Sequence, residues 1–191
     1  MLTQLRATPN QLTLLRLCMI PFLVIAVLDA HFKTAFLLFV LAGISDGLDG
    51  LLARRLNQRT SLGQYLDPIA DKLLLSTLFL VLTHVGLIRR YITVLVFGRD
   101  IIILLVCTLL FVAVGLRNFK PSLLGKANTV AQILALTTTL LAQFYAPRLL
   151  LEVRHAALWS TVALTTLSGF HYVWLVGKRL AEMGAETCER A

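Results

Sequence analysis

Six long apolar runs dominate this chain and limit what it can fold into. They cover residues 12–28, 34–52, 68–87, 91–114, 129–144 and 156–176, and short polar segments separate them. A helix needs about 20 apolar residues to cross roughly 30 Å of hydrocarbon, and within lipid a helix satisfies its own backbone hydrogen bonds. The runs therefore predict an all-α integral membrane protein with six transmembrane helices in one bundle.

The composition agrees with this prediction. Of the 191 residues, 58% are hydrophobic and only 15% are charged, with a mean hydropathy of +0.80, which is far from the balance of a soluble domain. The connections are too short for another domain, so residues 1–191 are expected to form a single membrane domain. Within it, about residues 1–10 form an interfacial segment and about residues 180–191 a cytoplasmic tail. The first run contains Arg16 and Pro21 and lacks a cleavage site, so we interpret it as a spanning helix.

The distribution of Lys and Arg predicts the orientation. Ten of the eighteen lie at the two termini and in the second-to-third and fourth-to-fifth connections, whereas five lie on the other side. The positive-inside rule then puts both termini in the cytoplasm, as in a multi-pass protein of a bacterial inner membrane. The net charge of +8 favours contact with anionic membrane lipids, and no nucleic-acid partner is expected.

Four of the six aspartates lie within the single segment 45–72, namely Asp46, Asp49, Asp67 and Asp71. Carboxylates in or near hydrocarbon are costly unless they are paired, bound to metal or hydrated. The spacings of three and four residues keep each pair on one face of a helix. Because helices joined by a short connection pack side by side, the two pairs are predicted to converge at the cytoplasmic mouth of the bundle.

Such a set of carboxylates indicates a metal site. Oxygen ligands suit Mg²⁺ or Mn²⁺, and four carboxylates can hold two such ions with exchangeable positions left for phosphate. Arg54 can bind a phosphate through a bidentate fork, while the small residues nearby leave room for a ligand, although close helix packing explains some of them equally well. Pro68 after Asp67 predicts a helix that begins there, with Asp67 near its N-cap.

The same residues carry a resemblance to a known family. Asp46, Asp49, Gly50, Ala53, Arg54, Gly63, Asp67 and Asp71 reproduce, with every gap intact, the signature DxxDGxxARx(8)GxxxDxxxD of the CDP-alcohol phosphotransferase family. The stretch "TPNQLTLLRL" resembles the PNxLTxxR entry motif of its phosphatidyltransferase branch, and "GKANTVAQ" opens the fifth run in a similar way.

The resemblance implies a six-helix membrane enzyme, commonly a homodimer, which transfers a phosphatidyl group from CDP-diacylglycerol to an alcohol and releases CMP. It implies that the four aspartates surround two divalent cations, Mg or Mn, and that Asp71 is also the general base. By the same resemblance, the cytidine is flanked by Gly50, Ala53 and Gly63, and the diphosphate is contacted by Arg54.

The acceptor alcohol is less clearly indicated. Sequences that resemble phosphatidylglycerophosphate synthases often carry a second arginine on the fourth helix and a lysine in a "GKxKT" stretch. This chain has Cys107 and Asn128 at the corresponding positions, which removes two potential phosphate ligands. The segments are more similar to those of CMP-forming cardiolipin synthases, whose acceptor is phosphatidylglycerol, and glycerol 3-phosphate remains the alternative acceptor.

Three cations are candidates for binding the acceptor, namely Arg99, Arg117 and Lys126. Arg99 is followed by Asp100, and a mutual ion pair that stabilises the bundle explains these two residues about as well. Contact with lipid headgroups is an alternative role for Arg117 and Lys126.

A divalent-cation or proton-coupled transporter would also need acids inside the membrane. Transport predicts acids along a path through the bilayer, but outside the segment 45–72 the runs contain hardly any acid besides Asp100. The sequence therefore favours an enzyme over a transporter.

Overall fold

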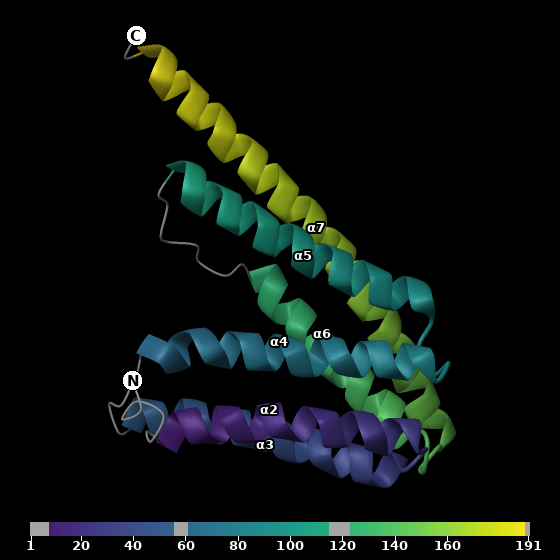
Figure 1. Cartoon of the computed structure of the whole chain (residues 1–191). Helices are drawn as coiled ribbons and strands as arrows, with labels where there is room; N and C mark the ends of the chain where they lie inside the picture. The colour runs from purple at the N-terminus through teal and green to yellow at the C-terminus, as the bar shows by residue number, and fades with distance from the viewer. Residues whose placement is uncertain (1–7, 56–60, 115–122, 190–191) are drawn as a thin grey trace. The chain divides into compact units, whose positions relative to one another are not determined.

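A computed structural model of the chain describes residues 8–55, 61–114 and 123–189, with side chains over 13–47, 69–103, 105 and 123–171. Within these ranges the chain is helical and contains no strand (Figure 1). The helices are α2 (Thr8–Leu28), α3 (Phe32–Arg55), α4 (Ser61–His84), α5 (Arg90–Val114), α6 (Leu123–Leu141) and α7 (Arg148–Glu189). The prediction of six helices is confirmed over the part of the chain that the structure describes.

All six helices extend beyond the apolar runs that predicted them, and α4 and α7 extend the furthest. α4 begins at Ser61 and α7 continues to Glu189, through most of the expected tail. The expectation that Asp67 lies near an N-cap is therefore wrong, because Asp67 and Pro68 lie inside α4. The reason lies in the preceding residues, since Leu62, Tyr65 and Leu66 have the helical spacing that continues into the apolar run.

The helices are between 19 and 42 residues long. Over the residues that the structure describes, none of them combines the length and the apolar content that crossing a bilayer requires. The membrane placement of these helices stays a prediction.

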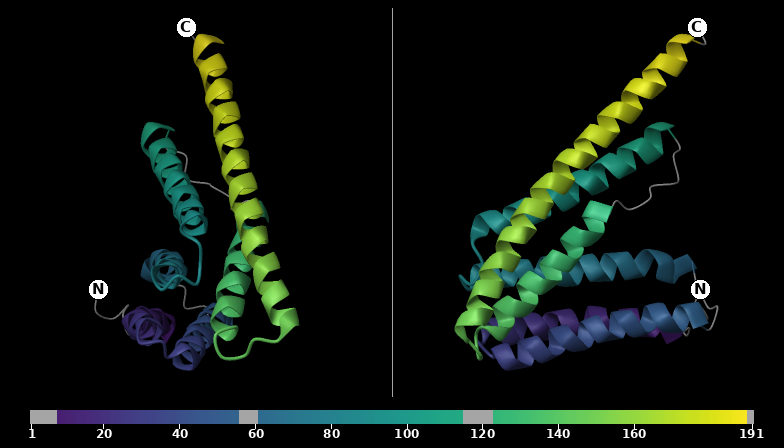
Figure 2. Two further views of the ribbon diagram at one scale, coloured as in Figure 1. Left: turned by 90° about the vertical axis from the view of Figure 1, so that its right-hand side faces the viewer. Right: turned by 180° about the vertical axis from the view of Figure 1, so that it is seen from behind.

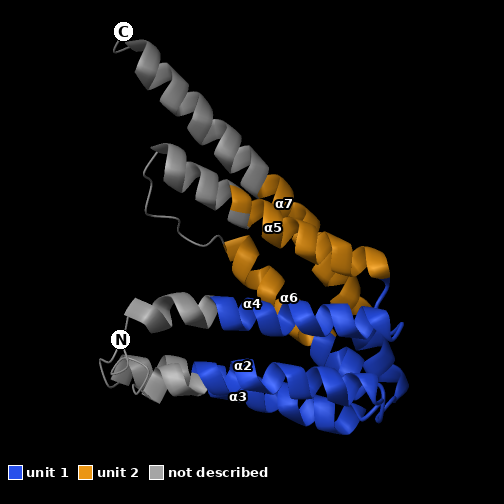
Figure 3. Ribbon diagram, in the orientation of Figure 1, with its two compact units in different colours: residues 1–89, 136–154 blue, residues 90–135, 155–191 orange. Residues whose placement is uncertain are grey.

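The chain divides into two compact units, which Figure 3 distinguishes by colour. Unit 1 comprises residues 1–89 and 136–154, and unit 2 comprises residues 90–135 and 155–191. α6 and α7 therefore each contribute to both units. The expected single domain over residues 1–191 stays a prediction.

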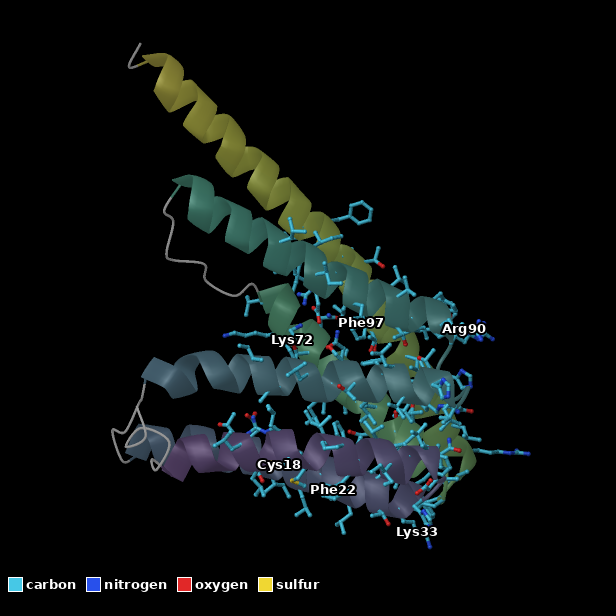
Figure 4. The ribbon with its side chains drawn as sticks, in the orientation of Figure 1. Cys18, Phe22, Lys33, Lys72, Arg90 and Phe97 are labelled. Carbon is cyan, nitrogen blue, oxygen red and sulfur yellow. The ribbon has the colours of Figure 1, made fainter. Side chains whose placement is uncertain are left out.

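In unit 1, α2, α3 and α4 run side by side (Figures 1 and 2), and α2 contacts both α3 and α4. Large apolar side chains fill the space between these helices, among them Leu23, Val27, Phe39, Leu78, Phe79 and Leu82. Burying one such side chain contributes about 1.5–3 kcal/mol. Cys18 and Phe22 lie on the side of α2 that faces away from α4 (Figure 4), and Phe22 is 64% exposed.

Two turns of unit 1 share one geometry. After α2, the N–H of His31 donates to the carbonyl of Ala26 (2.8 Å) and Ala30 adopts a φ of 57°. After α4, the N–H of Leu87 donates to the carbonyl of Leu82 (2.9 Å) and Gly86 adopts a φ of 80°. Both are helix ends closed by a residue in the left-handed region, a conformation that favours glycine.

The second of these turns is attached to the beginning of α7. Nη2 of Arg154 donates a hydrogen bond to the carbonyl oxygen of Leu87 at 2.6 Å. Burial lowers the pKa of the Arg154 guanidinium, because the charged form loses hydration. The hydrogen bond to Leu87 offsets part of that cost, and it connects two segments of unit 1 that are far apart in the sequence.

In unit 2, polar side chains connect α7 to α5 and to α6. Nε of Arg99 on α5 donates to Oγ of Ser168 on α7 at 3.1 Å. Oγ1 of Thr165, one turn earlier on α7, donates to Oδ1 of Asn128 on α6 at 2.9 Å. Hydrogen bonds between buried side chains therefore contribute to the packing of this unit.

Candidate functional site

The four signature aspartates lie on two helices, as their spacing predicted. Asp46 and Asp49 belong to α3, and Asp67 and Asp71 belong to α4. Residues three or four positions apart on a helix share a face, so each helix carries one pair. The side chains of Asp46 and Asp71 are described, whereas those of Asp49 and Asp67 lie outside the described side chains.

Asp46 forms an ion pair with a buried arginine of the neighbouring helix. Nη2 of Arg16 on α2 lies 2.9 Å from Oδ1 of Asp46 on α3. The side chain of Arg16 is 1% exposed and that of Asp46 is 49% exposed. Because a buried guanidinium needs a charged or strongly polar partner, α2 and α3 are aligned so that Asp46 reaches Arg16. The ion pair also restricts the orientation of the Asp46 carboxylate.

Asp71 belongs to the same electrostatic environment. It is half-buried on α4, and the charged groups that act on it are Asp46, Arg16 and Lys72. Two carboxylates and two cations from α2, α3 and α4 are thus close enough to influence one another. The convergence of all four aspartates stays a prediction.

The structure describes the side chains of only two of the four aspartates predicted to form the metal site, Asp46 and Asp71. Within the described side chains, no group of three or more His, Cys, Asp and Glu residues is arranged to hold a metal ion. Asp46 and Asp71 supply oxygen ligands on adjacent helices, which is the donor chemistry that Mg²⁺ and Mn²⁺ prefer. The two carboxylates therefore fit a divalent cation, and the complete set of four stays a prediction.

The residues predicted to contact the donor nucleotide lie on the same two helices. Gly50, Ala53 and Arg54 belong to α3, and Gly63 belongs to α4. The structure does not describe the side chains of these residues. Their roles stay predictions.

The predicted acceptor residues have different surroundings. Nη1 of Arg99 lies 2.7 Å from Oδ1 of Asp100, and both side chains are largely buried, with exposures of 11% and 16%. The ion pair considered as an alternative for these residues is therefore present. Lys126, near the beginning of α6, is exposed, and Arg117 lies outside the described residues.

Arg16 is the functional candidate that the sequence interpretation missed. In the sequence it is a charge inside the first apolar run, and it occupies the arginine position of the PNxLTxxR-like stretch. A charged residue inside an apolar run marks a functional site by default. That signal was sufficient to nominate Arg16, but its partner could be identified only from the packing of α2 against α3.

Comparison with known proteins confirms the resemblance drawn from the aspartate segment. The family model for CDP-alcohol phosphatidyltransferase matches residues 6–167 of this chain. The matched region includes the eight signature positions as well as Arg16, Arg99 and Asn128.

Individual relatives divide between two activities. The chain is 30% identical to human cardiolipin synthase (CMP-forming) over 195 residues, covering 92% of this chain and 63% of that protein. It is 32% identical over 188 residues to CDP-diacylglycerol–glycerol-3-phosphate 3-phosphatidyltransferase of Bacillus subtilis, covering 86% of this chain and 92% of that protein. The chain is also 37% identical over 183 residues to the protein of the same name from Sodalis glossinidius, covering 91% of this chain and 97% of that protein. The chain spans less than two thirds of the length of the human cardiolipin synthase.

Proposed function

The chain belongs to the CDP-alcohol phosphatidyltransferase family, and from that premise we propose that it transfers a phosphatidyl group from CDP-diacylglycerol to phosphatidylglycerol. The products are cardiolipin and CMP. The observation that carries the proposal is the ion pair of Arg16 with Asp46, whose charges also act on Asp71 of α4, inside the region that the family shares. Glycerol 3-phosphate is the alternative acceptor, because relatives named for that activity match equally well.

Two divalent cations, Mg²⁺ or Mn²⁺, are proposed as cofactors. Asp46, Asp49, Asp67 and Asp71 would hold them, and the described carboxylates of Asp46 and Asp71 support this donor set. When bound, the cations offset the charge of the diphosphate and improve CMP as a leaving group.

The protein's own groups have separate roles in this proposal. Asp71 accepts the proton of the acceptor hydroxyl group. At the same time the hydroxyl oxygen of the acceptor forms a bond to the phosphatidyl phosphorus. The bond from that phosphorus to the CMP oxygen breaks, and CMP leaves with the bonding electrons. Arg54 binds the diphosphate, while Gly50, Ala53 and Gly63 allow the cytidine to approach the backbone.

Arg16 has a positioning role in the proposed reaction. Its ion pair with Asp46 restricts one carboxylate of the site, and it also acts electrostatically on Asp71. Partners that hold metal-binding side chains in place commonly affect metal affinity and activity. Arg16 therefore belongs to the site although the family signature in α3 and α4 does not contain it.

The balance of charge supports phosphatidylglycerol over glycerol 3-phosphate. The phosphomonoester of glycerol 3-phosphate carries more charge than a phosphodiester, and it favours charge-assisted hydrogen bonds from several cations. Arg99 is neutralised by Asp100 at 2.7 Å. Cys107 and Asn128 add no charge.

The proposal places the enzyme in a membrane with both termini in the cytoplasm, and as a homodimer. Both lipid substrates have acyl chains that remain in the bilayer while the cytidine diphosphate is in water. Large apolar side chains are exposed along several helices, among them Phe22, Leu37, Val94, Leu105 and Phe170. Exposed apolar side chains of this size support contact with lipid or with a second copy of the chain.

The experiment that tests the proposed function is an assay of CMP release. Protein purified in detergent is incubated with CDP-diacylglycerol and Mg²⁺ or Mn²⁺, with phosphatidylglycerol or glycerol 3-phosphate in parallel. We expect metal-dependent release of CMP with phosphatidylglycerol and formation of cardiolipin. Release with glycerol 3-phosphate alone would establish the alternative, and no metal-dependent release with either acceptor would contradict the proposal.

A further inference from the structure

Five side chains of unit 2 form a buried cluster that the proposed chemistry at Asp71 does not use. We call Arg99, Asn128, Gln132, Thr165 and Ser168 the polar cluster. Asn128 is fully buried, and Gln132, Thr165 and Ser168 are each 2% exposed. Arg99 on α5 and Asn128 on α6 are both hydrogen-bonded to α7. The interior of this unit therefore contains a concentration of polar groups among three helices.

The hydroxyl groups of the polar cluster find their hydrogen-bond partners within the cluster itself. Oγ1 of Thr165 donates to Oδ1 of Asn128 at 2.9 Å, and Oγ of Ser168 donates to the carbonyl oxygen of Thr165 at 3.0 Å. Ser168 also accepts from Nε of Arg99. Packing of the three helices accounts for these groups.

The amide donors of α6 are different. Nδ2 of Asn128 and Nε2 of Gln132 are buried and have no hydrogen-bond partner among the described residues. The two residues are four positions apart, so they lie on one face of α6. A buried donor without a partner pays its full desolvation cost, and an apolar side chain of the same shape would avoid that cost. Two such donors on one face indicate that an oxygen-bearing ligand completes their hydrogen bonds.

The charges of the cluster limit the chemistry of that ligand. The Arg99 charge is balanced by Asp100 at 2.7 Å, and the remaining members are neutral. Lys126 is exposed, and its position two residues before Asn128 directs it to nearly the opposite face of α6. Neutral amide donors suit hydroxyl groups and the singly charged oxygens of a phosphodiester better than a phosphomonoester.

We propose that the amides of Asn128 and Gln132 donate hydrogen bonds to the glycerol-phosphodiester headgroup of the acceptor lipid and thereby determine acceptor preference. This inference rests on the proposed function, since it assigns the acceptor of the same reaction. It adds two binding residues, Asn128 and Gln132, to Arg99, Arg117 and Lys126, the candidates that the sequence nominated.

The first test is Gln132→Met, which removes the donor and keeps a similar volume. The KM for phosphatidylglycerol is expected to rise about tenfold, the effect of one lost hydrogen bond, with the KM for CDP-diacylglycerol unchanged. The melting temperature should stay the same or rise, because an unsatisfied buried donor has been removed. Gln143→Met is the matched control, since Nε2 of Gln143 donates to the carbonyl oxygen of Thr139 in unit 1.

The second test is Asn128→Asp, which keeps an oxygen to accept from Thr165 but replaces the amide donor with a charged acceptor. We expect the KM for phosphatidylglycerol to rise about 100-fold, because the new charge repels the phosphodiester. Binding is measured independently as the thermal shift that dodecyl maltoside micelles containing phosphatidylglycerol produce in the absence of CDP-diacylglycerol. That shift should decrease in both variants, and glycerol 3-phosphate should give little shift in the unaltered protein.

The outcomes separate this inference from the proposed function. If the unaltered protein releases no CMP with phosphatidylglycerol, the proposed function fails. If it does, but Gln132→Met and Asn128→Asp keep its KM and thermal shift, the inference fails and the function stands. A lower melting temperature in Gln132→Met with unchanged KM would make the amide a structural group and would equally overturn the inference.

Discussion

Unit 1 surrounds a mainly apolar interior built from leucine, valine and phenylalanine, whereas unit 2 buries about as many polar as apolar side chains among those described. In unit 1, the charged groups Arg16, Asp46 and Asp71 are added to a well-packed bundle of α2, α3 and α4. In unit 2, Asn128, Gln132, Thr165 and Ser168 form part of the interior, together with apolar residues such as Ile92. A domain selected for stability alone has little reason to bury unpartnered amides.

The difference separates two tasks. An apolar bundle gives rigid support to carboxylates that must be held close together against their mutual repulsion. Buried polar groups without partners lower the stability of the fold. Such groups are useful for binding a ligand that supplies the missing hydrogen bonds. The two proposals above concern different units, since Asp71 belongs to unit 1 whereas Asn128 and Gln132 belong to unit 2.

The largest effect is expected from Asp71→Asn in unit 1. Removing the group that accepts the proton should lower the rate of CMP release by about 10²–10⁴-fold, while CDP-diacylglycerol still binds. The assay is metal-dependent CMP release, with lipid binding measured in parallel. Asp29→Asn, at an exposed position directly after α2, is the control. Unchanged turnover in Asp71→Asn would remove this residue from the proposed role.

The apolar interior of unit 1 is tested by Leu78→Ala. Leu78 is fully buried on α4, so its truncation should destabilise the fold by about 3 kcal/mol and lower the melting temperature in detergent by several degrees. Leu80→Ala is the matched control because Leu80 is 52% exposed on the same helix. Equal effects of the two substitutions would show that unit 1 does not depend on this core.

A smaller effect is expected from Arg16→Gln, which removes the charged partner of Asp46. Activity or metal affinity should fall about 10–100-fold, as for other residues that orient metal ligands. The measurement is the concentration of Mn²⁺ that gives half-maximal CMP release, and Arg16→Lys should recover part of the loss. A double-mutant cycle with Asp46→Asn should show coupling, and additive effects would argue against a positioning role.

The smallest effects are expected at the two turns of unit 1. Gly86→Ala should destabilise the protein by about 1 kcal/mol, because an L-residue at φ 80° is strained. No other group lies within 4 Å of an added Cβ at Gly86, so the cost is conformational. Ala30→Gly should stabilise by a few tenths of a kcal/mol, since it relieves that strain but increases the freedom of the unfolded chain. Melting temperatures that move in the same direction would contradict this explanation.

Much of the arrangement of the site could be predicted from the sequence because it depends on local spacing. Asp46 and Asp49 on α3, and Asp67 and Asp71 on α4, lie on helices as expected. The prediction that α4 begins near Asp67 is wrong, because the helix begins at Ser61 and Leu62, Tyr65 and Leu66 continue its helical spacing. The possibility that Arg99 pairs with Asp100 was available from the sequence because the two residues are adjacent.

Contacts between helices could not be predicted in the same way. Arg16 and Asp46 belong to different helices, and their ion pair depends on the register of α2 against α3. Thr165 and Asn128 are 37 residues apart, and no local pattern relates them. Gln132 lies in the "GKANTVAQ" stretch, but only the structure shows that its amide is buried and lacks a partner among the described residues.

The sequence by itself determined the six helices, the pairing of aspartates on each of two of them and the membership of the family, because these properties depend on residue order and periodicity along one chain. Only the tertiary structure decided that Arg16 meets Asp46, that Arg99 is hydrogen-bonded to Ser168, and that two amides of α6 are buried without partners. The physical reason is that burial and partnership are properties of packed helices. Each depends on the rotation and offset of one helix against another, which local spacing does not specify.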